Sequence, residues 1–170
     1  MAAKELILDL AEIDLSRVIA GPEEIRRYNP QRDDMEQLSG ILLELSDERI
    51  CVGFKDTSER DFWVSGHMPG LPLMPGVIMC EAAAQLASYS VQKNDLLGAD
   101  LLGLGGLEEV RFREVVRPGD RLIIVAQLIK VRRGAMIICR FQSFVGDTLV
   151  CEGKIKGIPL PVAALKSQTP

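Results

Sequence analysis

The spacing of apolar positions predicts helical structure near the N-terminus. Leu6, Leu10 and Ile13 follow the three- and four-residue intervals of one helical face. The dipeptide Gly21-Pro22 then interrupts the pattern, since glycine and proline can end one helix and begin another. We therefore expect an N-terminal helical extension within residues 1–30, made of two short helices.

Two apolar runs between residues 39 and 54 predict a pair of β-strands. The runs GILLEL and RICVGF flank the polar triplet SDE, a pattern typical of two strands joined by a short turn. We expect the sheet to begin here.

A loop rich in glycine and proline precedes the longest predicted helix. Residues 66–76 read GHMPGLPLMPG, and we expect a stiff, irregular loop because proline fixes φ whereas glycine permits strained turns. The following VIMCEAAAQLASYSVQK has strong helix formers and apolar side chains on nearly every face. This predicts a largely buried central helix over residues 75–93.

From residue 101 onward the pattern changes to that of β-strands. The segments EEVRFREVV, RLIIVAQLIKV, AMIICRFQSFV and TLVCEGKIKGI are rich in valine and isoleucine and are separated by glycine-containing turns. They predict an antiparallel meander. With the earlier strand pair, they indicate an α+β fold in which a curved sheet wraps around one helix, as a single domain over residues 1–170.

Composition fits this picture and restricts the function. A chain of 170 residues with 47% hydrophobic and 26% charged residues is typical of one globular domain. The N-terminus has acidic residues where a secretory signal has a basic start, and the longest weakly charged run is interrupted by His67, Glu81 and prolines. We expect a cytoplasmic protein without membrane insertion.

The cysteine and histidine content argues against a metal site. Four cysteines lie in apolar stretches without the close pairing of zinc or redox sites, and the chain has a single histidine. We expect reduced core cysteines, no metal and no other cofactor. The cysteines are Cys51, Cys80, Cys139 and Cys151.

Charge is distributed unevenly along the chain. The net charge is −4, yet residues 111–133 hold 7 Lys and Arg against 2 Asp and Glu. Nucleic-acid readers combine an overall basic excess with interleaved aromatic residues, whereas this chain is only 5% aromatic. A small acidic partner fits better than nucleic acid.

His67 and Glu81 are the candidates for acid–base chemistry. Histidine is the side-chain type whose ordinary pKa lies nearest neutrality, and a carboxyl group on a buried helix is costly unless it is paired, protonated or used. Each has a structural alternative. His67 could merely hydrogen-bond inside a tight turn, and Glu81, Gln85 and Tyr89 could form one solvated stripe of an amphipathic helix.

Gly76 follows Pro75 at the predicted helix start, where free N–H groups and the positive end of the helix dipole point outward. Such groups could hold a carbonyl oxygen and stabilise charge that develops on it. An ordinary proline-initiated helix explains the same two residues without any function.

The segment FWVSGHMPGLPLMPGVIMCEAAAQ resembles the active-site segment of bacterial 3-hydroxyacyl-acyl-carrier-protein dehydratases, typically GHFPG-x-P-x-MPGVL-x-x-EA-x-AQ. His67 and Glu81 match the catalytic pair of that family at its spacing of 14 residues. The later VRFREVVRPGDRL, KVRRG and LVCEGKIK are also similar, so the resemblance covers roughly residues 39–156.

This resemblance implies a hot-dog fold and an obligatory homodimer, with a trimer of dimers as an open further possibility. Each active site would combine the histidine of one subunit with the glutamate of the other. His67 would remove the proton beside the thioester carbonyl, Glu81 of the partner subunit would protonate the departing 3-hydroxyl group, and the Gly76 amide would bind the carbonyl oxygen. The product would be a trans-2-enoyl thioester in fatty acid biosynthesis.

The resemblance also suggests how the substrate binds. The acyl chain would be carried on the phosphopantetheine arm of acidic acyl carrier protein, docked on arginines of the basic segment. Solvated arginines that block strand edges explain the same residues without a partner. The expected substrate-binding residues are Pro75, Val77, Gln85 and Met68, and the expected docking residues are Arg111, Arg113, Arg132 and Arg133.

Some positions depart from the family pattern. Met68 replaces a phenylalanine, Gln31 stands where a histidine is common, and residues 101–104 are aliphatic or glycine where a gating aromatic is common. Two other functions therefore stay open: a hot-dog thioesterase in which Glu81 activates water, and a non-catalytic acyl-binding protein. The dehydratase is the primary hypothesis because it uses both His67 and Glu81.

Overall fold

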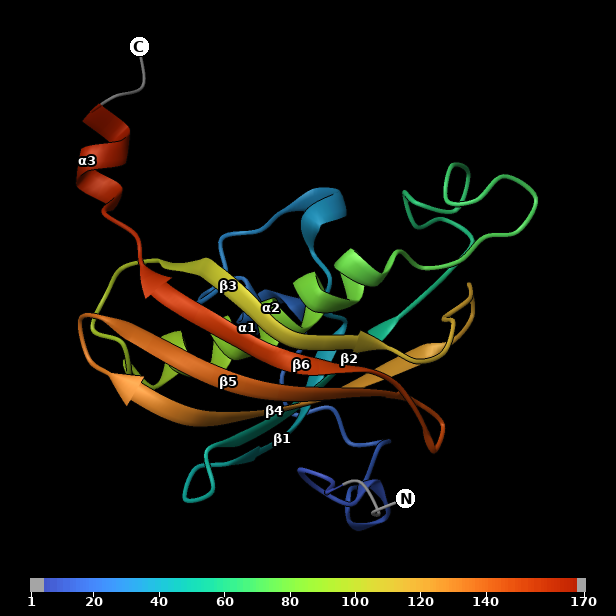
Figure 1. Cartoon of the computed structure of the whole chain (residues 1–170), viewed down its shortest axis with the longest axis horizontal. Helices are drawn as coiled ribbons and strands as arrows, with labels where there is room; N and C mark the ends of the chain where they lie inside the picture. The colour runs from blue at the N-terminus through green and yellow to red at the C-terminus, as the bar shows by residue number, and fades with distance from the viewer. Residues whose placement is uncertain (1–4, 168–170) are drawn as a thin grey trace.

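Six antiparallel strands form one curved sheet in the computed structural model, which describes residues 5–167 (Figure 1). The order across the sheet is β1-β2-β4-β5-β6-β3. One long helix lies against one face, so the predicted hot-dog architecture is confirmed. The strands are β1 (Gly40–Leu45), β2 (Ile50–Asp56), β3 (Leu102–Phe112), β4 (Arg121–Arg132), β5 (Met136–Val145) and β6 (Thr148–Pro159).

The predicted meander is correct for β4, β5 and β6 and wrong for β3. Loops of three and two residues join these later strands, and such short loops make sequential strands neighbours. The connection over residues 113–120 is too long for a hairpin turn, and β3 pairs with β6 at the sheet edge. The sequence pattern predicts a strand over residues 108–116 that overlaps β3 only at 108–112, and it does not identify its neighbour.

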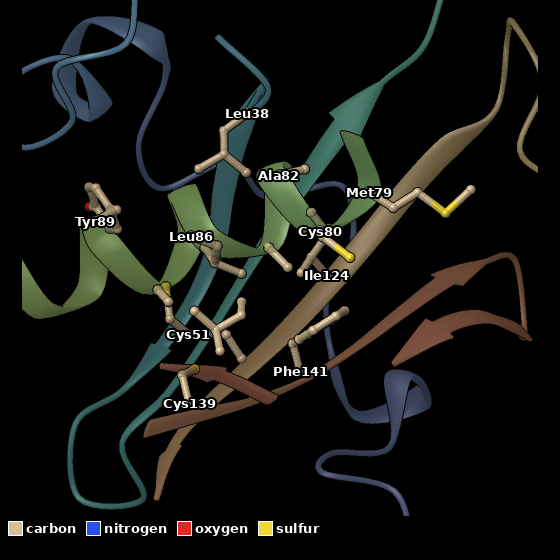
Figure 2. Packing of buried hydrophobic residues seen from close by; sticks show 14 of the residues in the cluster. Leu38, Cys51, Met79, Cys80, Ala82, Leu86, Tyr89, Ile124, Cys139 and Phe141 are labelled. Carbon is tan, nitrogen blue, oxygen red and sulfur yellow. The ribbon is translucent and has the colours of Figure 1, made fainter. Parts of the chain in front are cut away.

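The central helix α2 (Gly76–Lys93) agrees with the predicted range to within one residue. Figure 2 shows Cys80 and Leu86 pointing from α2 toward sheet residues such as Ile124 and Phe141. Close approach depends on a glycine of β2, because a Cβ at Gly53 would lie 2.9 Å from Leu86 Cδ1. The helix thus packs directly onto the sheet.

The far end of α2 is tied to β1 by a polar cluster. Lys93 Nζ donates to Glu44 at 2.9 Å and to the Tyr89 hydroxyl at 2.9 Å. Burial raises the pKa of Tyr89 to about 12, and the ring stacks edge-on against Tyr28. These contacts fix the orientation of the helix on the sheet.

The N-terminal segment differs from the prediction. Of the two expected helices, only the second forms, as α1 (Pro22–Ile25), while the first is reduced to the 3₁₀ turn η1 (Leu10–Glu12). A further 3₁₀ turn, η2 (Asp33–Met35), follows. The prediction for residues 1–4 lies outside the described part of the chain.

The apolar residues that suggested a helix serve a different packing. They form a strap, residues 5–15, across the sheet face opposite α2, held where Gln142 Oε1 accepts the Ile7 N–H at 2.8 Å. An irregular strap needs apolar side chains at intervals just as a helix does, so spacing alone did not distinguish them. The strap side chains Ile7, Leu8, Leu10, Ile13 and Leu15 cover a second core of Leu42, Ile50, Val52, Phe54, Ile123, Val125 and Phe144.

All four cysteines are free and buried, as predicted. Burial raises the pKa of the Cys51 thiol and raises that of Cys139 to about 12. Within residues 5–167, no group of three or more His, Cys, Asp or Glu side chains could hold a metal ion. No helix in this range is long and apolar enough to cross a membrane.

The loop between β2 and α2 and the C-terminal helix lie at opposite ends of the sheet (Figure 1). The helix α3 (Val162–Ser167) was not predicted, because six residues, none of them buried, carry too little periodic signal. The loop carries His67 and extends away from the sheet. The candidate chemistry is therefore at the end of the sheet where α2 begins.

We expect Leu86→Ala to lower the free energy of unfolding by about 2–5 kcal/mol, because the fully buried side chain fills the space between α2 and Gly53. Ile129→Ala, which truncates a half-exposed side chain on β4, should change it by less than about 0.5 kcal/mol. Urea unfolding followed by circular dichroism measures both, and equal effects would contradict this account of the core.

Candidate active site

His67 lies in an exposed loop whose base is buried. Trp63 and Met74 flank the loop, each 3% exposed, and the Trp63 carbonyl accepts the His67 N–H at 2.8 Å. The Met74 N–H donates to the Val116 carbonyl at 2.8 Å, which ties the loop to the segment after β3. The loop is therefore irregular, as predicted, but anchored at both ends.

The imidazole of His67 is held by a single hydrogen bond. Its Nδ1 lies 2.9 Å from the Leu73 carbonyl oxygen. A carbonyl oxygen can only accept, so Nδ1 carries the proton and Nε2 of the neutral ring has a free lone pair. The tight-turn role and the base role are thus compatible, since the bond inside the turn selects the tautomer that a base needs.

Glu81 is partly buried on the second turn of α2, and its carboxylate is held by a buried amide. Gln85 Nε2 donates to Glu81 Oε1 at 2.7 Å and to the Met35 carbonyl at 2.7 Å, while Gln85 Oε1 accepts the Gln37 N–H at 2.9 Å. Within the described residues no hydrogen bond reaches the second carboxyl oxygen of Glu81, which leaves that oxygen for a reactant.

The alternative of a solvated stripe on α2 is wrong. Gln85 is 2% exposed and Tyr89 is 0% exposed, so the stripe that contains Glu81 faces the interior. Both N–H groups of the Gln85 amide donate hydrogen bonds, and its oxygen accepts one. In this structure the amide supports Glu81, and contact of Gln85 with substrate stays a prediction.

Gly76 is the first residue of α2, with Pro75 as the N-cap. Within the described residues, the N–H groups of Gly76 and Val77 have no acceptor, whereas those of the next two residues donate to the Pro75 carbonyl. The helix start therefore presents free donors, as expected of a carbonyl-binding site.

The predicted substrate residues other than Gln85 are at least partly exposed. Met68 is 49% exposed on the loop of His67, while Val77 is 69% exposed and Pro75 is partly buried at the start of α2. Phe112, at the end of β3, is also half-exposed and was not among the predicted residues. Its ring lies beside Gly76, so Pro75, Val77 and Phe112 are the apolar residues at the helix start.

No hydrogen bond joins His67 to Glu81 within the described chain. His67 projects on a loop beyond the end of the sheet, while Glu81 lies on α2 beneath the sheet (Figure 1). One chain therefore presents each group separately, with the histidine open to solvent.

The predicted docking arginines do not form one surface in a single chain. Arg111 lies level with Gln142 of β5, whereas Arg132 pairs with Met136, six residues along the same strand. At about 3.3 Å per residue, the two arginines are about 20 Å apart along the strand direction alone, and they also lie three strands apart across the sheet. Arg133, next to Arg132, forms an ion pair with Asp95.

Arg111 at the end of β3 and Arg113 just after it belong to a larger basic patch that was not predicted from the sequence. Arg140 of β5 and Lys154 of β6 join Arg111 and Arg113 around a shallow groove, because cross-strand pairing brings these distant positions together. Two acids balance part of the charge: Glu152 pairs with Arg113, and Glu109 pairs with Lys154. The patch keeps a positive excess of two.

Comparison with known proteins identifies similar sequences over most of the chain. Residues 29–154 match the FabA-like domain. The 3-hydroxyacyl-[acyl-carrier-protein] dehydratase FabZ of Moorella thermoacetica is 37% identical over 114 residues, which cover 67% of this chain and 79% of that protein. The enzyme of the same name from Alkalilimnicola ehrlichii is 30% identical over 149 residues, 86% of this chain and 95% of that protein.

Solved structures of low sequence identity share the fold. The dehydratase heterocomplex ApeI:P from Xenorhabdus doucetiae aligns with a TM-score of 0.65 at 14% identity, covering 91% of this chain and all of the compared chain. The E. coli PaaI protein aligns with a TM-score of 0.54 at 14% identity, covering 69% of this chain and 80% of that one. These likenesses support the hot-dog architecture.

We expect Gln85→Leu to lower the free energy of unfolding by about 1–3 kcal/mol, because it leaves the buried Gln37 N–H without a partner and also removes the hydrogen bond to the Met35 carbonyl. Gln92→Leu removes one exposed hydrogen bond from the same helix and should change stability by less than about 0.5 kcal/mol. Chemical denaturation compares the two variants, and an undiminished stability of Gln85→Leu would refute the supporting role.

Proposed function

The chain belongs to the FabA-like family, and we propose that it removes water from 3-hydroxyacyl thioesters on acyl carrier protein, giving trans-2-enoyl thioesters in fatty acid biosynthesis. The observation that carries this proposal is that the matched region encloses both His67, with a free Nε2, and Glu81, with one open carboxyl oxygen. Elimination of water needs one base and one acid, and the chain offers one of each.

His67 acts as the base in this mechanism. Its Nε2 removes a proton from C2 of the acyl chain, beside the thioester carbonyl, while the bond from Nδ1 to Leu73 keeps the ring in place. The electron pair of the C2–H bond moves toward the carbonyl. The free N–H of Gly76 donates a hydrogen bond to the carbonyl oxygen and so stabilises the negative charge that develops there.

Glu81 acts as the acid. Its carboxyl proton is transferred to the 3-hydroxyl group as the C3–O bond breaks, so that water leaves and the C2–C3 double bond forms. Gln85 holds one carboxyl oxygen, which directs the other toward the substrate. The proton taken by His67 and the proton given by Glu81 balance the reaction, and no cofactor takes part.

We propose that the working site forms between two copies of the chain. β3 is an edge strand of the described sheet, and Leu104 and Leu107 on it are exposed, although open edges with apolar side chains are normally covered. Pairing of β3 with a second copy would cover this edge. It would also bring His67 of one subunit toward Glu81 of the partner subunit.

We further propose acyl carrier protein as the docking partner and the cytoplasm as the location. The basic patch begins with Arg111 at the end of β3 and runs to the middle of β5 and β6, so an acidic carrier docked there could place its arm within reach of the site. Free thiols in the core agree with a reducing compartment.

A hot-dog thioesterase is the competing function. Hydrolysis with Glu81 alone would leave the fixed tautomer of His67 without a use. The same holds for a non-catalytic acyl-binding protein, which needs neither group. The dehydratase explains both residues and their supports.

The purified protein should change the mass of a 3-hydroxyacyl thioester by the loss of one water, with the thioester intact, and His67→Ala should lower kcat by about 100- to 10,000-fold. Mass spectrometry of the acyl carrier protein follows the reaction. Release of a free thiol would instead identify a thioesterase, and an unchanged substrate would indicate a binding protein.

Mixing His67→Ala with Glu81→Ala should restore activity through hybrid dimers. Random exchange puts half of the dimers in hybrid form with one intact site each, so about a quarter of wild-type activity is expected. The variants are mixed after mild dissociation and assayed together with each variant alone. Activity no higher than that of the separate variants would contradict a site shared between subunits.

Arg111→Glu should raise KM for the carrier-linked substrate about 5- to 10-fold and leave KM for a short pantetheine thioester unchanged, because the charge contacts only the carrier. Arg132→Glu, at the other end of the sheet, serves as the matched variant and should change neither value. If Arg132→Glu raised KM for the carrier-linked substrate more than Arg111→Glu does, the docking site would lie at the end of the sheet near Arg132.

A further inference from the structure

The ring of Phe112 occupies the space beside the first residue of α2. A Cβ placed on Gly76 would lie 2.7 Å from Phe112 Cε1 and 2.9 Å from two other atoms of the ring. Such distances are well inside van der Waals contact, so glycine is the residue that lets β3 and the helix start meet. Phe112 therefore forms a wall directly beside the free N–H of Gly76.

The backbone that carries this ring is fixed. Phe112 pairs with Cys151 of β6, and the next residue, Arg113, donates its N–H to the Val150 carbonyl at 2.7 Å and pairs with Glu152. Val116 then accepts the N–H of Met74, from the loop that leads into α2. The ring can change rotamer, but its backbone cannot withdraw from the helix start.

One side of the ring is open. Phe112 is 52% exposed, although the side toward Gly76 is in close contact. Val77, the next residue of α2 after Gly76, is also exposed. A ligand held by the Gly76 N–H would therefore touch the ring of Phe112.

The side of the thioester that meets the ring follows from the path of the substrate. The carbonyl carbon has two substituents, the sulfur atom and C2. The sulfur continues into the pantetheine arm and must lead outward to the carrier, whereas C2 leads toward the acid and base. With the sulfur directed outward, C2 is the substituent that would face the wall made by β3 and α2.

We propose that Phe112 limits substitution at C2, so that the enzyme accepts 3-hydroxyacyl thioesters unbranched at C2 and rejects those with a 2-methyl group. This inference rests on the proposed dehydratase function and adds a determinant of substrate choice to it. A 2-methyl substrate keeps one C2 proton, so His67 and Glu81 could still eliminate water from it. The barrier to its reaction is the space that Phe112 fills.

The test compares kcat/KM for a 3-hydroxybutyryl and a 2-methyl-3-hydroxybutyryl thioester. In the wild-type protein the unbranched substrate should be preferred by about 10- to 200-fold, the range in which one methylene group is discriminated by a closely fitting pocket. Phe112→Ala should reduce that preference at least 10-fold. A wild-type protein that dehydrates neither substrate would refute the proposed function itself, which separates that failure from failure of this inference.

Control variants keep the result interpretable. Phe112→Leu keeps an apolar side chain but removes the ring, and it should reduce the preference in the same direction if Phe112→Ala does not fold. Ile129→Ala removes an exposed apolar side chain from the opposite end of β4 and should leave the preference unchanged. Equal losses of activity toward both substrates in the two Phe112 variants would overturn the proposal. The ring would then support the site without discriminating between the unbranched and the 2-methyl substrate.

A second measurement tests the contact itself. Gly76→Ala places a methyl group where the ring lies and should lower kcat/KM for the unbranched substrate at least 10-fold. In the double variant Gly76→Ala with Phe112→Ala, part of that activity should return, since the clash is gone. Strictly additive losses would show that the ring does not border the carbonyl site.

Discussion

The burial of α2 against one face of the sheet is the constraint on which the rest of the molecule depends. A single helix supplies one side of the main core, and its apolar side chains, such as Leu86, leave few positions for polar groups. Glu81 is acceptable there because Gln85 pairs with it and with the segment over residues 35–37. The core packing and the proposed acid–base chemistry therefore use the same helix, and the amide of Gln85 connects them.

The second face of the sheet explains what the N-terminal segment does. A curved sheet with apolar residues on both faces needs a cover on each, and one helix covers only one of them. The strap of residues 5–15 covers part of the other face and is held by Gln142 from β5. The two cores are separate clusters, so changes in the strap reach the site only through the sheet itself.

The local sequence pattern predicted most of the helix and strands. The errors concern features that depend on contacts between distant parts of the chain. The helix α2 and the six strands follow from periodicity, because neighbouring residues decide whether a segment shows one apolar face or two. The position of β3 at the edge depends on a contact with β6, which no local pattern contains. The apolar spacing of the N-terminal residues was equally compatible with a strap.

The candidate site shows the same division. His67, Glu81 and Gly76 were predicted because they lie within 14 residues of one another in a recognisable segment. The role of Gln85 could not be read from the segment, since the groups that saturate its amide come from residues 35 and 37.

Phe112 illustrates why a gating aromatic sought by sequence position was not found. An aromatic residue was expected within residues 101–104, but the ring beside Gly76 belongs to Phe112, eight residues after position 104 on β3. What brings it there is geometric: β3 ends where α2 begins, and the backbone bond between Met74 and Val116 holds the two together. Any bulky side chain at position 112 would contact the start of α2, and any side chain at position 76 would clash with it. In the proposed site Gly76 has two linked requirements, a free N–H for the substrate carbonyl and no Cβ toward Phe112, and the absence of the Cβ is what allows the ring to lie beside that N–H.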